Sequence, residues 1–232
     1  VRGIWDYFVK PQAYAQWLQR VEPQVELFNP VRLLKWNGHK AYLVELAQAG
    51  LSVTPTHLCR QGAQASLAAI ADAQGWESVV VKPAISGAGR LTRLFSRAEH
   101  ARAGQEHLEA VLQEGDALVQ PFLRALQEEG ERSYVFIDGA FSHAVHRAPT
   151  MGADVVPDGT AMAPRADELL LSQRILKAAP TPTLYARVDL ATGPDGAPML
   201  QELEVIEPRL FLASAPGAAE RMADAILARA RR

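Results

Sequence analysis

The sequence lacks most of the features that assign a protein to a specialised class. Its 232 residues contain a single cysteine, Cys59, so no disulfide can form within the chain, which fits a cytoplasmic location. Basic and acidic residues number 24 and 26, so no excess of positive charge favours nucleic acid as a partner. No apolar run approaches the roughly 20 residues that a membrane-spanning helix needs. These absences indicate a cytoplasmic protein that binds neither nucleic acid nor membrane.

What is present is a mixture of helical patterns and β-hairpins, with enough hydrophobic residues (48%) for a large core. The pair Asp138-Gly139 is a type I′ turn signal between two predicted strands. The mixture predicts an α+β fold with antiparallel sheets and not a doubly wound sheet. The predicted strands cover residues 53–57, 78–83, 91–95, 117–123, 132–137, 140–146, 185–190 and 199–206. The predicted helices cover residues 11–21, 31–36, 39–49, 64–74, 98–113, 166–178 and 217–232.

Two further segments carry expectations about organisation. Residues 1–8 have the pattern of a strand end entering a loop, and the chain does not begin with Met, so we expect an α/β segment upstream to be largely missing. An exposed strand end can pair with a second copy of the chain, so a homo-oligomer is one state that we consider. Residues 148–164 are rich in Gly, Pro and small residues, which predicts a mobile loop.

The last two predicted strands carry the clearest chemical signal. Side chains alternate along a strand, so Arg187 and Asp189 share one face, and Glu202 and Glu204 share one face of the next strand. If the strands pair, three carboxylates and an arginine meet. Carboxylates this close repel one another without a cation, and an all-oxygen donor set favours Mg²⁺ together with a substrate phosphate. The alternative is a strand face that points into water.

A second signal is typical of phosphate binding. Lys82 follows three valines at a strand end, and a loop with Ser86, Gly87 and Gly89 comes next. Glycines let backbone N–H groups approach an anion, and a hydroxyl and an ammonium add donors. The chain has only five lysines, and Lys40 precedes this region. The loop is not a P-loop. The alternatives are an ordinary hairpin tip and surface lysines whose stems pack on the protein.

A third segment, residues 119–123, is a strand that runs into a loop around a proline. The carbonyl of Pro121 and the N–H of Leu123 could hold an adenine base. Proline has no backbone N–H, but at this position only its carbonyl is needed as an acceptor. Glu131 or Glu128 could then bind ribose hydroxyls. The alternative is a strand edge followed by a solvated acidic turn.

Taken in order, these segments resemble the ATP-grasp superfamily, most closely its glutathione synthetase-like and D-alanine–D-alanine ligase-like members. A closely similar group includes the cyclo-ligase of D-cycloserine biosynthesis, which couples a nucleophile within one substrate. The resemblance covers essentially all 232 residues. The motifs that carry it are Trp36-Asn-x-x-Lys40, Val80-Val-Lys-Pro83, Ser86-Gly-Ala-Gly89, Val119-Gln-Pro-Phe-Leu123, Gly130-Glu-Arg-Ser133, Phe136-Ile-Asp-Gly139, Ala186-Arg-Val-Asp189 and Gln201-Glu-Leu-Glu204.

The resemblance implies an ATP-grasp fold, in which two α+β subdomains with antiparallel sheets grip a nucleotide and the N-terminal α/β domain is here largely missing. Residues 1–30 would be the remnant of that domain. Residues 31–118 would form the small subdomain with a helical linker, and residues 119–232 the C-terminal subdomain that carries the metal site.

The resemblance also implies roles for individual residues. Lys40 and Lys82 would contact ATP phosphates, and Arg187 would steady the transferring phosphoryl group, with Arg132 as the second expected catalytic residue. The loop that closes over the triphosphate would contain Ser86, Gly87 and Gly89. The adenine and ribose would contact Gln120, Pro121, Phe122, Leu123 and Glu131. Two Mg²⁺ ions would be held by Asp189, Glu202 and Glu204.

The function implied is that of an ATP- and Mg²⁺-dependent carboxylate–amine ligase that forms an acyl phosphate on a small amino-acid-like substrate. One alternative is intramolecular ligation on the same fold. Another is a nucleotide-binding protein without catalysis, because relatives commonly carry a Phe-Arg pair in the mobile loop, where residues 152–157 contain no arginine. A third is an α+β interaction module whose carboxylates form only a solvated face.

Overall fold

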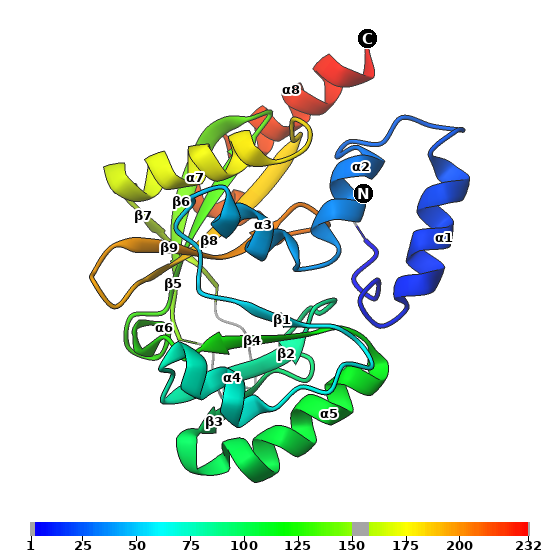
Figure 1. The fold of residues 1–232 in the computed structure, drawn as a ribbon. Helices are drawn as coiled ribbons and strands as arrows, with labels where there is room; N and C mark the ends of the chain where they lie inside the picture. The colour runs from blue at the N-terminus through cyan, green and yellow to red at the C-terminus, as the bar shows by residue number, and fades with distance from the viewer. Residues whose placement is uncertain (1–2, 150–157, 232) are drawn as a thin grey trace.

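The computed structural model describes residues 3–149 and 158–231. Two antiparallel sheets face each other across the middle of the molecule (Figure 1). The four-stranded sheet has the order β1-β4-β2-β3, and the five-stranded sheet has the order β7-β6-β5-β8-β9. This arrangement confirms the predicted α+β class with antiparallel sheets.

The elements have the following bounds. The strands are β1 (His57–Cys59), β2 (Ser78–Pro83), β3 (Arg93–Ser96), β4 (Ala117–Pro121), β5 (Glu131–Ile137), β6 (Ala140–Arg147), β7 (Thr160–Met162), β8 (Tyr185–Thr192) and β9 (Pro198–Glu204). The α-helices are α1 (Pro11–Val21), α2 (Val31–Asn37), α3 (Tyr42–Gln48), α4 (Leu67–Gln74), α5 (Gln105–Glu114), α6 (Arg124–Glu128), α7 (Ala166–Ala178) and α8 (Ala218–Ala230). A 3₁₀ turn and a π-helical turn precede α5, and a 3₁₀ turn lies between β9 and α8.

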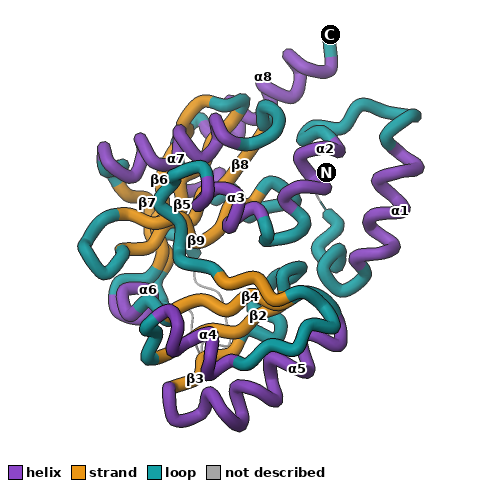
Figure 2. The backbone as a smooth tube through the Cα atoms, viewed as in Figure 1, coloured by secondary structure: helices purple, strands orange, loops and turns teal. Residues whose placement is uncertain are grey.

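The four-stranded sheet has one apolar face and one face that is open to the space between the sheets. In β2, alternation sends Val79 and Val81 into a core that they share with Leu108 and Val111 of α5. The helices α4 and α5 lie on this side, away from the five-stranded sheet (Figure 2). The neighbouring residue Lys82 therefore projects from the opposite face, toward the other sheet.

The five-stranded sheet is covered on both faces. Tyr134 and Phe136 of β5 share a core with Leu171 and Ile175 of α7. The alternate residues of the same strand, Val135 and Ile137, pack with Met222 and Ala225 of α8. Helix α8 does not reach the start of β5, so on its side of the sheet the ends of β5, β8 and β9 are left for polar residues.

Several predicted elements are confirmed closely. The bounds of β2 and α7 are those predicted, and β8 pairs with β9 as the two carboxylate strands were expected to do. The turn between β5 and β6 has both central residues in the left-handed region, Asp138 at φ 51° and Gly139 at φ 76°, as a type I′ turn requires.

We expected the end of a strand to enter a loop over residues 1–8, and the described part of that segment contains no strand. Residues 4–9 form turns, with the Tyr7 N–H bonded to the Ile4 carbonyl at 3.0 Å. The Glu207 carboxylate accepts hydrogen bonds from the N–H groups of Gly3 and Ile4 at 3.0 and 2.8 Å. These backbone donors are thereby satisfied by a side chain from the end of the five-stranded sheet, and not by a neighbouring strand.

Other differences are smaller. The strand β1 covers His57–Cys59 and shares only His57 with the strand expected at residues 53–57. The short helix α6, which was not predicted, ends at Glu128, where the acidic segment 128–131 begins. Strand β7 lies within the segment 148–164 that was expected to be a loop. The arginine-free stretch 152–157 lies outside the described residues.

The division into subdomains stays a proposal. Strand β4 lies wholly in the four-stranded sheet, and the expected division at 118/119 falls inside it. We therefore propose that the two subdomains divide after Pro121. None of the helices in the described part of the chain is long and apolar enough to cross a membrane.

Candidate functional site

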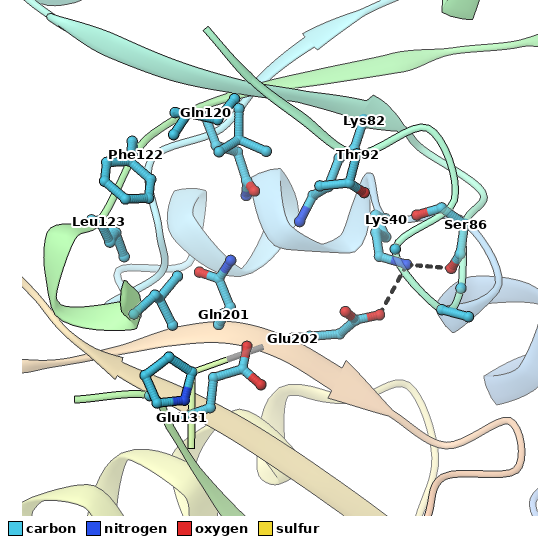
Figure 3. Close-up of a pocket in the computed structure, with 18 of the residues that line it drawn as sticks. Lys40, Lys82, Ser86, Thr92, Gln120, Phe122, Leu123, Glu131, Gln201 and Glu202 are labelled. Carbon is cyan, nitrogen blue, oxygen red and sulfur yellow. Dashed lines mark hydrogen bonds and ion pairs between the residues drawn. The ribbon is translucent and has the colours of Figure 1, made fainter. Parts of the chain in front are cut away.

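The two sheets enclose a cleft of about 500 Å³, a size that suits a cofactor or small ligand. Figure 3 shows side chains from both sheets pointing into it. Each residue that the sequence predicted at the nucleotide lines this cleft, namely Lys40, Lys82, Ser86, Gly87, Gly89, Gln120, Pro121, Phe122, Leu123 and Glu131. The cleft is also lined by residues to which sequence reasoning assigned no role at the nucleotide, among them Thr92, Leu94, Leu126 and Gln201.

Lys82 is the cation that most clearly lacks a partner. Its side chain points into the cleft (Figure 3) and is only 7% exposed. Among the residues that the structure describes, it has no hydrogen bond or ion pair. Burial lowers the pKa of Lys82 to about 8, although the Glu202 carboxylate opposes that shift. A buried ammonium without a partner costs free energy, and a phosphate group would relieve that cost.

Lys40 joins the two sides of the cleft. Its Nζ donates to the Ser86 carbonyl at 2.7 Å and forms an ion pair with Glu202 Oε1 at 2.9 Å (Figure 3). Its backbone N–H also donates to the Ala84 carbonyl at 2.8 Å. Lys40 thus ties the glycine-rich loop after β2 to strand β9.

The glycine-rich loop is packed from outside by the N-terminal segment. A Cβ added at Gly87 would lie 2.6 Å from the Phe8 ring, so this position has no room for a larger residue. The loop backbone can therefore lie close to both Phe8 and a ligand in the cleft.

The opposite end of the cleft is more apolar. Phe122 and Leu123 lie at this end, away from Lys82 and Lys40 (Figure 3). The Phe122 N–H bonds to the Ser78 carbonyl at 2.9 Å, which holds the segment after β4 against β2. An apolar slot next to backbone groups is typical of a site for a nucleotide base.

Glu131, the expected ribose ligand, is engaged by Arg147 of β6 in this structure. The preceding residue, Gly130, has φ 79°, and a Cβ there would lie 2.1 Å from the Arg147 carbonyl oxygen. Glycine is therefore required for β5 to begin this close to the end of β6.

The carboxylates meet as the alternation of the strands predicted. Across β8 and β9, Asp189 lies opposite Glu202, and Arg187 lies opposite Glu204. The Arg187 guanidinium donates to both Asp189 oxygens, with contacts at 2.8 Å, and also pairs with Glu204. Ser133 of β5 donates to Asp189 Oδ1 at 2.6 Å, a contact that sequence reasoning missed.

Burial and neighbouring cations compete at these carboxyl groups. Burial raises the pKa of Asp189, but Arg187 and Arg147 outweigh it, and the pKa falls to about 2. Lys40 and Lys82 likewise lower the pKa of Glu202 against the effect of burial. At Glu204, burial and the charges of Asp189 and Glu202 outweigh Arg187, and the pKa rises to about 7. Glu204 is therefore the carboxyl group whose charge is least compensated.

These residues fit Mg²⁺ by their chemistry. The donors are all carboxylate oxygens, which Mg²⁺ prefers, and the uncompensated charge of Glu204 favours an additional cation. Glu202 and Glu204 line the cleft, whereas Asp189 is buried behind it. In the described part of the chain, no three acidic, His or Cys side chains converge closely enough to hold a metal as they stand, because Arg187 and Lys40 lie between the carboxylates.

A second chamber of about 400 Å³ adjoins the cleft. The two share a wall that includes Lys40, Glu202 and Glu204. Beyond this wall, the chamber is lined by guanidinium groups and aromatic rings, from Arg147, Arg187, Arg209, Trp5, Tyr7, Phe8 and Phe211. Sequence reasoning missed this chamber because residues 1–8 were expected to be the end of a strand that enters a loop and pairs upstream.

Arg132 does not join the site. Its guanidinium pairs with the fully buried Glu168 of α7 at 2.5 Å and donates to Thr192 at 3.0 Å, and it lines neither cavity. Since Glu131 lines the cleft, alternation along β5 places Arg132 on the opposite face. This arrangement gives no support to the expected catalytic role.

Comparisons with known proteins find similarity over almost the whole chain. The cycloserine biosynthesis protein DcsG from Streptomyces lavendulae is 30% identical over 249 residues, which cover 98% of this chain and 81% of DcsG. The crystal structure of D-cycloserine synthetase DcsG matches with a TM-score of 0.88 at 27% identity, covering 98% of this chain and 82% of that one. D-alanine–D-alanine ligase from Bacillus anthracis, complexed with ATP, matches with a TM-score of 0.67 at 17% identity, covering 86% and 67% of the two chains. No family model matches the sequence.

Proposed function

The chain belongs to the ATP-grasp superfamily of ligases, and from this premise we propose that it uses ATP and Mg²⁺ to join a carboxylate to an amine on a small amino-acid-like substrate. One observation carries the proposal. A single cleft brings together every residue expected at the nucleotide, and its buried Lys82, which has no partner among the described residues, faces carboxylates across it. The fold similarity to a ligase complexed with ATP supports the same nucleotide.

We place the ATP phosphates at the end of the cleft with Lys82, Lys40 and Ser86. Lys82 would supply the charge that the phosphates need, and Lys40 would exchange Glu202 for a phosphate oxygen. The base would lie in the apolar slot beside Phe122 and Leu123. Glu131 would release Arg147 to accept hydrogen bonds from ribose hydroxyls.

Asp189, Glu202 and Glu204 would hold Mg²⁺ against the phosphates. The ion, when bound, would neutralise charge on the transferring phosphoryl group. Ser133 and Arg187 would orient Asp189 through the hydrogen bonds described above.

The second chamber is the proposed location of the substrate. Its guanidinium groups would attract a carboxylate toward the wall shared with the cleft. A carboxylate oxygen would attack the γ-phosphorus of ATP, the bond to ADP would break, and an acyl phosphate would form. The amine nitrogen would then attack the carbonyl carbon, lose a proton and expel phosphate. Arg187 would stabilise the negative charge of the phosphoryl group in both steps.

Intramolecular ligation is a second candidate, and it is favoured by the similarity to D-cycloserine synthetase over almost the whole chain. In that case the carboxylate and the nucleophilic nitrogen belong to one molecule. ADP production would then need one substrate and not a pair.

The test is ADP release with single amino-acid-like compounds and with pairs of them. We expect at least one compound or pair to stimulate release, and Lys82→Ala and Glu202→Gln each to abolish it. Nucleotide binding without any stimulated ADP release would favour the non-catalytic alternative. The absence of both binding and release would favour an interaction module.

A further inference from the structure

The outer edge of β9, the last strand of its sheet, is held in two ways. Near its start, backbone bonds of 2.9 Å join Leu200 to residues 52–54, from the Leu200 N–H to the Ser52 carbonyl and from the Thr54 N–H to the Leu200 carbonyl. Beyond Leu200, at the two glutamates, the described residues hold this edge with side chains. Two buried residues from the helical linker bond to this side. Asn37 Nδ2 donates to the Leu203 carbonyl at 2.7 Å, and Asn37 Oδ1 accepts from the Val205 N–H at 3.2 Å. The Tyr42 hydroxyl accepts from the Leu203 N–H at 3.0 Å and contacts its carbonyl at 3.1 Å.

These bonds converge on Leu203, the residue between Glu202 and Glu204. On its other side, Leu203 lies opposite Val188 of β8, and its side chain is 1% exposed in the main core. Leu203 is therefore fixed by the sheet, by the core and by two linker side chains. Because neighbouring residues in a strand point the opposite way, fixing Leu203 directs both glutamates toward the cleft.

We propose that Asn37 and Tyr42 are positioning residues that set the spacing and direction of the two glutamates toward Mg²⁺ by fixing the Leu203 backbone. The inference rests on the proposed metal site and adds residues that touch neither metal nor nucleotide. Both side chains are well buried, Asn37 at 8% and Tyr42 at 1% exposed, so water does not replace them easily. Loss of partners that orient metal ligands typically lowers metal affinity about 10- to 100-fold.

Two conservative variants test the proposal in the whole chain. Tyr42→Phe removes the hydroxyl and keeps the ring that packs 5.1 Å from the Trp36 ring. Asn37→Asp keeps an acceptor for the Val205 N–H and replaces the amide that donates to the Leu203 carbonyl with an oxygen. The readout is the ratio of two affinities, for Mn²⁺–ADP and for metal-free ADP, measured by calorimetry. The electron paramagnetic resonance spectrum of bound Mn²⁺ reports its ligand geometry.

We expect this ratio to fall about tenfold in each variant, with the affinity for metal-free ADP within twofold of wild type and an altered Mn²⁺ spectrum. The matched control is Ser52→Ala, which removes a side-chain bond of 2.8 Å to the Pro198 carbonyl at the other end of β9. It should leave the ratio unchanged. Should Asn37→Asp fail to fold in a thermal melt, Tyr42→Phe decides alone.

The outcomes separate this inference from the proposed function. An unchanged ratio in the variants, with metal-dependent binding in wild type, overturns the positioning role and leaves the proposed metal site standing. An equal loss in Ser52→Ala also overturns it, because any weakening of β9 would then suffice. Equal affinity of the wild type for Mn²⁺–ADP and metal-free ADP overturns the metal site and, with it, this inference.

Discussion

The two sheets bring opposite charges to the cleft, and they hold those charges differently. On the four-stranded sheet, Lys82 is buried, and no partner for it exists among the described residues. On the five-stranded sheet, Asp189 and Glu204 share Arg187, and Glu202 pairs with Lys40. The Lys82 side of the cleft is therefore already arranged to bind an anion. On the opposite side, a metal ion must replace Lys40 and Arg187 as the partner of the carboxylates. Lys82 therefore indicates a bound anion, whereas Arg132, which pairs with the buried Glu168 and lines neither cavity, stabilises the fold.

The largest expected effect comes from a fully paired cation. Arg132→Met would leave the carboxylate of Glu168 buried without its main cation, with only Tyr134 and the more distant Arg165 beside it. We expect the free energy of unfolding to fall by about 3 kcal/mol. Chemical denaturation measures this loss. In the folded variant, the affinity for ADP should equal that of wild type, and a large fall in that affinity would contradict the structural role given to Arg132.

Lys82→Met, in contrast, should stabilise the ligand-free protein and weaken nucleotide binding. Removal of an unpaired buried charge should raise the free energy of unfolding of the ligand-free protein by about 1–3 kcal/mol. It should also weaken ADP binding about 100-fold, because a hydrogen-bonded charge on the phosphates is lost. The control is Lys35→Met, since Lys35 is 45% exposed and pairs with Glu22 on the surface. A destabilised Lys82→Met with normal ADP affinity would count against the phosphate site.

A smaller effect should appear with pH. The pKa of Lys82 is lowered to about 8, with Glu202 and Lys40 as the charged groups nearest to it. Phosphate binds the protonated form, so ADP affinity should fall about tenfold per pH unit above pH 8. Lys82→Arg should keep its affinity to a higher pH. Parallel profiles for the wild type and Lys82→Arg would show that another group titrates.

The lowered pKa of Lys82 also makes the free energy of unfolding depend on pH. In the unfolded chain, Lys82 keeps its proton to about its ordinary pKa of 10.5, so between pH 8 and 10.5 the unfolded state binds more protons than the folded state. The unfavourable contribution of Lys82 is therefore present below pH 8 and disappears as the pH rises. The stability advantage of Lys82→Met should shrink over that range, which denaturation of both proteins at several pH values would measure.

Much of this site follows from local sequence rules. Period-two alternation was enough to bring Arg187 and Asp189 together with Glu202 and Glu204, and the valine run before Lys82 was enough to place it at a strand end. The same alternation, applied along β5 from Glu131, would also have turned Arg132 away from the cleft.

What the sequence could not supply are contacts between distant segments. The bonds from Asn37 and Tyr42 to Leu203 span more than 160 positions, and no local pattern indicates them. The N–H groups of Gly3 and Ile4 bond to the carboxylate of Glu207, which lies more than 200 positions away in sequence. The second chamber arises from that long-range contact, and therefore the aromatic wall formed by Trp5, Tyr7 and Phe8 could not be predicted.

The central claim is that the carboxylates of the five-stranded sheet hold Mg²⁺ against a nucleotide bound by Lys82. Calorimetric titration with ADP, with and without Mg²⁺, on the wild type and on Glu202→Gln tests it most directly. Glu220→Gln, an exposed change on α8, is the matched control. We expect Mg²⁺ to tighten ADP binding in the wild type and in the control. In Glu202→Gln, the increase in ADP affinity that Mg²⁺ causes should be about 10- to 100-fold smaller. Binding that ignores Mg²⁺, or an equal Mg²⁺ effect in Glu202→Gln, would contradict the claim.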